Sequence, residues 1–295
     1  MTGVEPGPEW FEDAIAVEPD SRSVDVEGVE IAVRIWGPAD AEKAVVLVHG
    51  GSANMRWWDH IAPMLGPERR VVALDLSGHG DSARRSSYSL DEWSAEVAVV
   101  ATLPGMPAKP TLVGHSMGGF VVLNCGVLNA AEIGGVVVLD SPVREPTPEQ
   151  KEALAKRAFG PLKLYPDKAT AIARFRPVPE QEHSLRYVLR HIAEESLREP
   201  PDGWCWKFDP GMFGRQLPLP DLLREVDTRV ALFRSECGLV TPEIGEQMYE
   251  WLGRRAPVIE LPLAGHHPML DQPLPLIVAL RTILADWEHS WPLPR

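Results

Sequence analysis

Short, continuously apolar runs recur along the first half of the chain, and each is followed by glycine or a polar residue. The clearest runs are Ala44–Val48 within a predicted strand over 43–48, Val71–Leu74, Thr111–Val113 and Gly135–Leu139. A strand covered on both faces has such a run, whereas a strand with one solvated face alternates apolar and polar residues. We therefore predict four interior strands in this half of the chain.

Segments with helical spacing of apolar residues separate these strands. They are a segment with Trp57, Trp58, Ile61 and Leu65, a helix over 91–103 capped by Ser89 or Asp91, and a helix over 120–128. Strands that alternate with helices predict a mostly parallel, doubly wound sheet, in which ligands bind beyond the carboxyl ends of the strands. Four polar residues stand at such ends: His49, Asp75, Ser116 and Asp140.

The beginning of the chain does not show this alternation of strands and helices. Residues 1–22 are predicted to form an N-terminal tail, in which Trp10, Phe11 and Ile15 could dock on the body. Residues 23–26 and 30–36 alternate apolar and polar side chains on either side of Glu27-Gly28, which predicts an antiparallel hairpin.

The alternation of strands and helices is also interrupted between residues 142 and 226. Prolines separate three helical segments there, over 149–159, 167–175 and 182–199, and an aromatic run that includes Trp204, Trp206 and Phe208 follows them. We predict a helical cap inserted over the strand ends. The α/β pattern then resumes with strands over 229–233 and 258–261 and helices over 242–252 and 273–287. The core is therefore predicted to comprise residues 23–141 and 227–295.

The sequence Gly114-His115-Ser116-Met117-Gly118 joins one of the apolar strands to a helix. A serine hydroxyl is a useful nucleophile only when it stands clear of the backbone, within reach of a base and beside backbone donors. A sharp turn achieves this, but it leaves no room for a Cβ atom two residues before or after the serine. The spacing predicts a nucleophile elbow with Ser116 at its apex.

Three motifs occur in the order found in one large superfamily. His49-Gly50-Gly51, Gly114–Gly118 and Gly265-His266 each follow a predicted strand. The chain resembles the α/β-hydrolases, as a serine esterase-like member with a helical cap. The resemblance implies an eight-stranded, mostly parallel sheet and a serine hydrolase that works through an acyl-enzyme without a cofactor.

The resemblance also identifies a base. His266 follows the last predicted strand in a Gly-His turn, where the α/β-hydrolases place theirs. His267 is the alternative, whereas His115 is expected to pack beneath the site because its side chain should point away from the apex. A metal held by His266 and His267 is disfavoured, because adjacent side chains diverge and no carboxylate-rich motif accompanies them.

The carboxylate that would orient the base has two candidates. The loop after the strand over 229–233 has Gly238 where the commonest family pattern has an Asp, although the loop still offers Glu236. Asp140, at the end of the strand next to the nucleophile strand, is the other candidate, and in this position it resembles the acid of some bacterial esterases and dehalogenases of the same fold. Asp140 is preferred and Glu236 remains the alternative acid.

The resemblance implies an oxyanion hole made by the backbone amides of Gly51 and Met117. Trp58, Trp204 and Trp206 are candidates for lining the substrate pocket. The alternative, which the sequence supports equally well, is that they pack in the core and the cap. The loop Asp75-x-x-Gly78-x-Gly80-x-Ser82 is interpreted as structural, because its spacing fits no phosphate-binding fingerprint.

Composition narrows the range of partners. The chain has 295 residues, 44% hydrophobic and 24% charged, with a formal net charge of −13, which argues against nucleic acid and anionic membranes as partners. Three cysteines without CxxC spacing favour a reducing cytoplasm, and the acidic, proline-containing start does not resemble a secretory signal.

These observations favour hydrolysis of a small to medium carboxylic ester. A carbon–carbon bond hydrolase of the β-diketone type and a lactonase are the alternatives on the same triad. A ligand receptor without catalytic activity on the same fold is the alternative from another class. No metal and no cofactor are expected, and the sequence leaves the oligomeric state open.

Overall fold

The computed structural model describes residues 6–144, 162–212 and 220–290. Eight strands form one sheet in the order β1-β2-β4-β3-β5-β6-β9-β10. Their bounds are β1 Asp20–Val26, β2 Val29–Trp36, β3 Lys43–Val48, β4 Arg69–Leu74, β5 Thr111–His115, β6 Gly135–Leu139, β9 Val230–Cys237 and β10 Val258–Gly265. Only the β1–β2 and β2–β4 pairs are antiparallel within this sheet, so the predicted mostly parallel, eight-stranded α/β sheet is confirmed.

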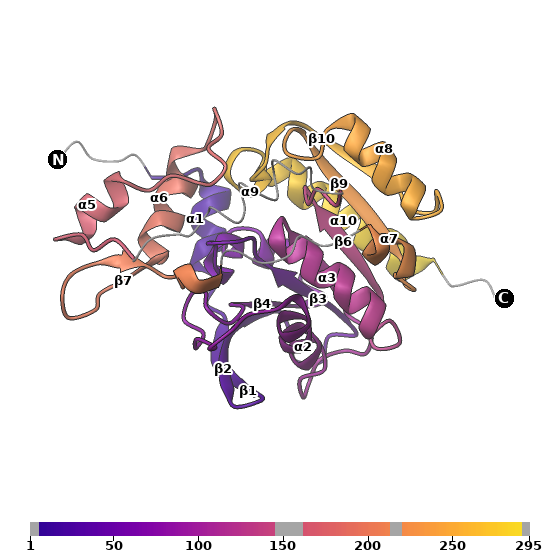
Figure 1. Ribbon diagram of the computed structural model, residues 1–295, viewed down its shortest axis with the longest axis horizontal. Helices are drawn as coiled ribbons and strands as arrows, with labels where there is room; N and C mark the ends of the chain where they lie inside the picture. Colours follow the sequence, from indigo (N-terminus) through magenta and orange to yellow (C-terminus); the bar gives the residue numbers. More distant parts are fainter. Residues whose placement is uncertain (1–5, 145–161, 213–219, 291–295) are drawn as a thin grey trace.

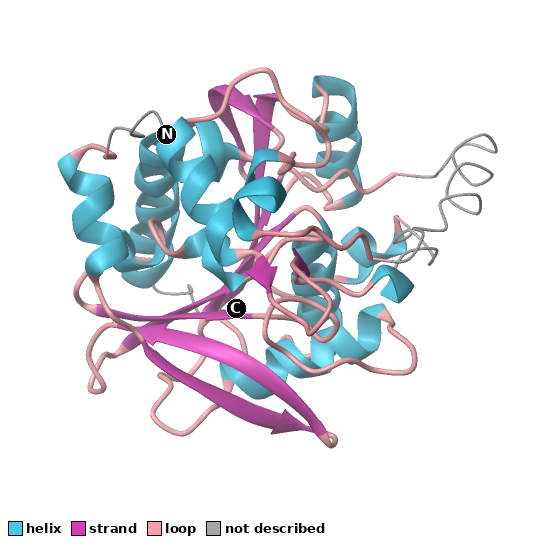
Figure 2. Cartoon of the chain, turned by 90° about the vertical axis from the view of Figure 1, so that its left-hand side faces the viewer, coloured by secondary structure: helices cyan, strands magenta, loops and turns pink. Residues whose placement is uncertain are grey.

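The continuous apolar runs arise because helices cover both faces of the sheet (Figures 1 and 2). Along β3, Val45 and Leu47 belong to one core cluster, whereas Val46 and Val48 belong to the cluster on the other face. Successive side chains of a strand point to opposite faces, so both sets must be apolar. The helices α1 Glu9–Ala16, α9 Pro268–Asp271 and α10 Pro273–His289 cover the first face; α2 Leu90–Ala101, α3 Met117–Leu128, α7 Asp221–Glu225 and α8 Pro242–Trp251 cover the second.

The predicted helix around Trp57 and Leu65 is instead two short 3₁₀ helices, η1 Met55–Trp58 and η2 Ala62–Leu65. Pro63 lies in the first turn of η2, and its missing N–H prevents a continuous α-helical ladder across the segment. The apolar residues still face the core, so the spacing predicted burial correctly and the helix type incorrectly.

The segment predicted as a tail contains regular structure. Helix α1 occupies residues 9–16, and β1 begins at Asp20, three residues before the predicted start of the hairpin. Phe11 is 2% exposed and contacts the rings of His60, Tyr187 and His191. Docking of the aromatic residues is thus observed, and the division of the chain into tail, core and cap stays a prediction.

The described part of residues 142–226 contains short helices and two short strands, joined by loops. It contains α5 Lys168–Ala173, α6 Arg186–Glu195, the two-stranded pair β7 Leu197–Arg198 and β8 Cys205–Trp206, and η3 Pro210–Met212. The predicted helix over 149–159 lies outside the described residues. Helix α6 is shorter than the predicted 182–199 because the chain leaves it to enter β7, and its Val188 and Ile192 pack in the same core cluster as Phe11.

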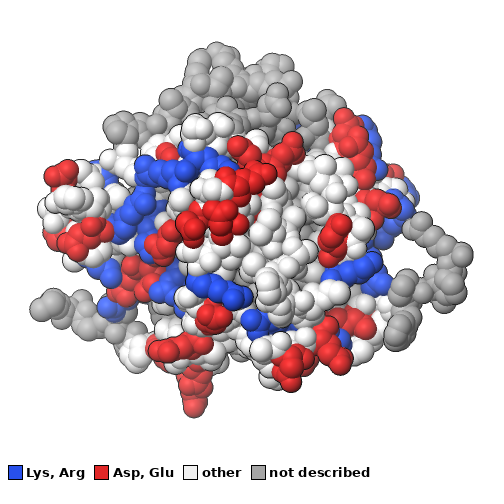
Figure 3. Space-filling model, turned by 90° about the horizontal axis from the view of Figure 1, so that it is seen from below, with Lys and Arg blue, Asp and Glu red and all other residues white. Residues whose placement is uncertain are grey.

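The surface carries both signs of charge. Lys and Arg side chains alternate with Asp and Glu on the face shown in Figure 3. Within the described ranges, no helix combines the length and the apolar character that crossing a bilayer requires.

Candidate active site

Ser116 lies between β5 and α3 with φ 53° and ψ −116°, a backbone conformation that residues other than glycine rarely adopt. A Cβ at Gly114 would overlap the carbonyl of Gly118, and a Cβ at Gly118 would lie 2.5 Å from the carbonyl oxygen of His49. The two glycines therefore permit the close packing that holds the turn, as the motif required.

A chain of two hydrogen bonds joins three predicted site residues from three distant parts of the sequence. The Nε2 atom of His266 lies 3.0 Å from the Oγ atom of Ser116. The Nδ1 atom of the same ring lies 2.7 Å from the Oδ2 atom of Asp140. Because a carboxylate only accepts, Nδ1 carries the proton in the neutral ring and Nε2 presents a lone pair to the serine hydroxyl.

Asp140 is fully buried, and backbone donors surround its carboxylate. The N–H groups of Ser235, Leu239 and Val240 donate to its two oxygens at 3.2, 2.8 and 3.2 Å. All three belong to the end of β9 and the loop that follows it. These donors replace water around the negative charge, which explains how an aspartate at 0% exposure remains compatible with the fold.

The alternative acid lies elsewhere. Glu236 is exposed, and its Oε2 atom accepts a hydrogen bond from the N–H of Leu263 at 2.7 Å. A Cβ at Gly238 would lie 2.5 Å from the Oδ1 atom of Asp140. The Asp140 carboxylate therefore occupies the space that a side chain at position 238 would need.

The two residues predicted to form an oxyanion hole lie close to each other, and Met117 directly follows Ser116. Met117 is the first residue of α3, so its N–H has no acceptor within the helix. A Cβ on Gly51 would lie 3.8 Å from the Sδ atom of Met117, which places the two residues against each other. Both residues are half-buried.

Two further histidines adjoin His266. His115 makes a hydrogen bond from Nε2 to the carbonyl of His266 at 2.8 Å, and burial, followed by the neighbouring His266, lowers its pKa to about 3. The rings of His266 and His267 lie 4.6 Å apart, so the expectation that they diverge was wrong. The reason is local: the pair lies in the turn between β10 and α9, where side chains do not alternate as they do along a strand.

The three predicted pocket tryptophans have different surroundings. Trp58 is 0% exposed within a core cluster, so its ring meets no solvent in this structure. Trp204 and Trp206 are half-buried, and the ring of Trp206 packs against Phe175 at 5.2 Å between centroids. Their role as substrate pocket stays a prediction.

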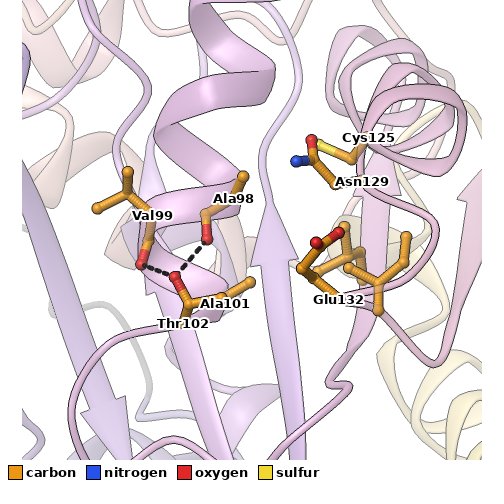
Figure 4. Close-up of a pocket in the computed structure, with 9 residues that line it drawn as sticks. Ala98, Val99, Ala101, Thr102, Cys125, Asn129 and Glu132 are labelled. Atoms are coloured by element: carbon orange, nitrogen blue, oxygen red, sulfur yellow. Dashed lines mark hydrogen bonds between the residues drawn. The ribbon is translucent and has the colours of Figure 1, made fainter.

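Two cavities of the described structure lie away from Ser116. One of about 220 Å³ is lined by the last turn of α2 and by Cys125, Asn129 and Glu132 (Figure 4). A larger groove of about 1190 Å³ follows α5 and α6. Neither is lined by a predicted site residue.

The loop after β4 is structural, as predicted. Asp75 accepts hydrogen bonds from the N–H groups of Met55 and Asp81 at 2.6 and 2.7 Å, and burial raises its pKa to about 7. The Ser82 hydroxyl donates to the Asp75 carbonyl at 2.6 Å. The loop therefore holds η1 against the end of β4.

A polar cluster that no sequence pattern indicated joins η1 to α6. Asp59 pairs with Arg34 and lies 3.0 Å from Nε2 of His191, while Arg56 pairs with Glu195. The cluster links segments more than a hundred residues apart, so no local pattern could have revealed it.

A serine at a strand-to-helix elbow, beside a histidine that follows the last strand, defines the class of α/β-hydrolases. The sequence matches the model of the alpha/beta hydrolase family over residues 45–280. The chain therefore belongs to this family, and it is a hydrolase that resembles esterases.

Two relatives and one solved structure illustrate the similarity. Esterase Rv0045c from Mycobacterium tuberculosis is 28% identical over 273 residues, 88% of each chain. The pimeloyl-[acyl-carrier protein] methyl ester esterase of Neisseria meningitidis is 26% identical over 246 residues, 79% of this chain and 90% of the relative. The solved structure of E-2-(acetamidomethylene)succinate hydrolase has a TM-score of 0.79 at 21% identity, over 91% of this chain and all of the other, and supports the fold alone.

Proposed function

We propose that the protein hydrolyses small to medium carboxylic esters through an acyl-enzyme on Ser116. The hydrogen-bonded chain from Ser116 through His266 to Asp140 carries this proposal. Two of the similar proteins are named as esterases, which supports the choice of an ester substrate.

The first half of the proposed reaction forms the acyl-enzyme. As the Ser116 oxygen attacks the ester carbonyl, its proton passes to Nε2 of His266, and Asp140 stabilises the resulting imidazolium. The amides of Gly51 and Met117 donate to the oxyanion, where one such donor typically contributes about 3 to 4 kcal/mol. Collapse of the intermediate breaks the C–O bond, and His266 returns the proton to the leaving alkoxide.

The second half repeats these roles with water as the nucleophile. His266 accepts a proton from the water, the hydroxide oxygen bonds to the acyl carbon, and the carboxylic acid leaves as Ser116 regains its proton. The proposed steps need no cofactor. The aromatic residues Trp204 and Trp206 are proposed to contact the acyl or alcohol part of the substrate.

Covalent labelling tests the nucleophile. A fluorophosphonate probe should label the protein, and Ser116→Ala should abolish labelling. Ser235→Ala is a matched control, because Ser235 is a buried serine near Asp140 whose hydroxyl has no hydrogen-bond partner in the described structure. Labelling that survives in Ser116→Ala would contradict the proposal.

A substrate panel tests the reaction class. p-Nitrophenyl esters of graded acyl length should be hydrolysed faster than lactones or β-diketones at equal concentration. Preference for a lactone or a β-diketone would assign one of the alternative reactions to the same residues. If the probe labels Ser116 but no compound of the panel is hydrolysed, the alternative of a ligand receptor without catalytic activity would be favoured.

A further inference from the structure

Three imidazole rings meet beside the serine. His115, at the end of β5, lies with His266 and His267, which follow β10, and one ring nitrogen from each lies within 4.8 Å of the others. The ring centroids are separated by 4.9 Å for His115 and His266 and by 5.3 Å for His115 and His267. The three side chains are all buried.

The hydrogen bonds fix which nitrogen of each ring carries a lone pair. His115 and His267 donate from Nε2 to the carbonyls of His266 and Pro179, at 2.8 and 3.2 Å, so in the neutral rings Nδ1 is the acceptor. His266 donates from Nδ1 to Asp140, so Nε2 is its acceptor. Each ring therefore has one lone pair, and a carboxylate orients the ring of the base.

One of these lone pairs lacks a partner. The Nδ1 atom of His267 is buried without a hydrogen bond in the described part of the chain, an arrangement that costs free energy unless a ligand occupies it. A Cβ on Gly50 would lie 3.0 Å from the Nδ1 atom of His115 and 3.2 Å from the Cβ of Ser116, so this nitrogen and the serine border the same small space. Ser116 is half-buried, so the serine beside this space is in contact with solvent.

We propose that His115, His266 and His267 form an inhibitory site for a divalent transition metal such as Zn²⁺. Three neutral imidazoles suit Zn²⁺, Ni²⁺ and Cu²⁺, and do not suit Mg²⁺. Tetrahedral zinc at about 2.0 to 2.1 Å from each nitrogen requires the nitrogens to lie about 3.4 Å apart, so the rings would have to draw together from spacings of up to 4.8 Å when the ion binds. The fourth position is left to water or the Ser116 hydroxyl.

Metal binding at this site is a coordination step without redox change. A bond forms from Nε2 of His266 to the metal, and the hydrogen bond from the Ser116 hydroxyl to that nitrogen breaks. Because a lone pair bound to a metal cannot accept a proton, the base is lost while the ion stays bound. Inhibition thus depends on the proposed function, whereas binding of the ion does not.

Calorimetry on Ser116→Ala tests binding without any activity. One Zn²⁺ per chain should bind, and Co²⁺ should give the visible absorption bands of a four-coordinate site. His115→Gln and His267→Gln, made on the same background, keep an N–H donor in the place of Nε2 but remove the imidazole ligand. Each should weaken Zn²⁺ binding at least about tenfold, equivalent to ~1.4 kcal/mol. His289→Gln, an exposed histidine on α10, is the matched control and should leave binding unchanged.

Activity measurements on the otherwise unaltered chain complete the test. Zn²⁺ should inhibit ester hydrolysis, EDTA should restore it, and Mg²⁺ should have no effect. Cys237→Ser controls for the exposed thiol, a competing zinc ligand near the same loop, and should remain sensitive. The proposal is overturned if Zn²⁺ fails to bind Ser116→Ala, if either glutamine variant binds it as tightly as the parent, or if Cys237→Ser abolishes inhibition.

Discussion

The ends of β6 and β9 lie side by side in the sheet, yet only one of them carries a carboxylate in contact with His266. Asp140, after β6, is buried and accepts three backbone hydrogen bonds. Glu236, near the end of β9, is exposed and binds the backbone of Leu263. The second region supplies amides to the first, so the two strand ends have complementary roles. The end of β6 provides the charge, and the β9 loop provides its solvation.

Space and backbone donors, more than position in the sequence, decide which of the two carboxylates contacts His266. The two arrangements exclude each other, because a side chain at Gly238 and the carboxylate of Asp140 require the same volume. An acid at position 238 would therefore have to replace Asp140 and could not be added to it.

The largest expected effect follows from removing the buried charge. Asp140→Asn preserves the shape of the side chain but offers an N–H₂ group to His266, which favours the wrong tautomer. By the precedent of other serine hydrolases, kcat should fall by roughly four orders of magnitude. Steady-state hydrolysis of a p-nitrophenyl ester, with circular dichroism to verify folding, measures this. If kcat falls by less than about tenfold, or ~1.4 kcal/mol of barrier, Glu236 would become the preferred candidate for the acid that orients His266.

Moving the acid should restore part of the activity. Asp140→Gly removes the carboxylate and tolerates the positive φ of 45° at that position, and Gly238→Asp then has room for its side chain. The double variant should have a kcat at least about tenfold above Asp140→Gly alone, or ~1.4 kcal/mol of barrier. Gly238→Asp in the unaltered background should reduce activity. If the double variant is no better than Asp140→Gly, the two positions are not interchangeable.

A single methyl group should disturb the same contact more mildly. Gly238→Ala forces its Cβ against the Asp140 carboxylate, and overpacking of this kind typically costs about 1 to 3 kcal/mol. Urea denaturation should show the loss in the free energy of unfolding. Gly245→Ala in α8, where a Cβ would meet its nearest atom at 3.6 Å, is a control for the effect of an added methyl. Equal stabilities of the two variants would contradict the proposed contact.

The smallest effect is expected at the exposed acid. Glu236→Gln removes a charge but keeps an acceptor for the N–H of Leu263, so stability should change by less than about 0.5 kcal/mol. The kcat for ester hydrolysis should stay within about twofold, less than ~0.5 kcal/mol of barrier. A kcat loss as large as that of Asp140→Asn would reverse the comparison on which these experiments rest.

The sheet and the elbow could be predicted because their causes are local. Doubly buried strands need consecutive apolar residues, and the turn at Ser116 needs Gly114 and Gly118, so both left short patterns in the sequence. The strand end that carries Asp140 could be predicted for the same reason.

The remaining details depend on contacts between distant segments. Nothing near Asp140 indicates that amides 95 to 100 residues later surround it. The proximity of His266 to His267 follows from a turn conformation, and the pairing of Asp59 with Arg34 and His191 joins three separate elements. Roles assigned to Gly51, Met117 and the tryptophans stay predictions, because they concern a substrate rather than the fold.

Helix α1 has a practical consequence for anyone who shortens the chain at its beginning. The ring of Phe11 fills the space between His60, which lies between η1 and η2, and Tyr187 and His191 of α6. Deleting residues 1–17 would leave a hollow there and take away one support of α6. Limited proteolysis of such a truncated protein should therefore find earlier cleavage around residues 180–200, far from the deleted end in sequence but next to it in space.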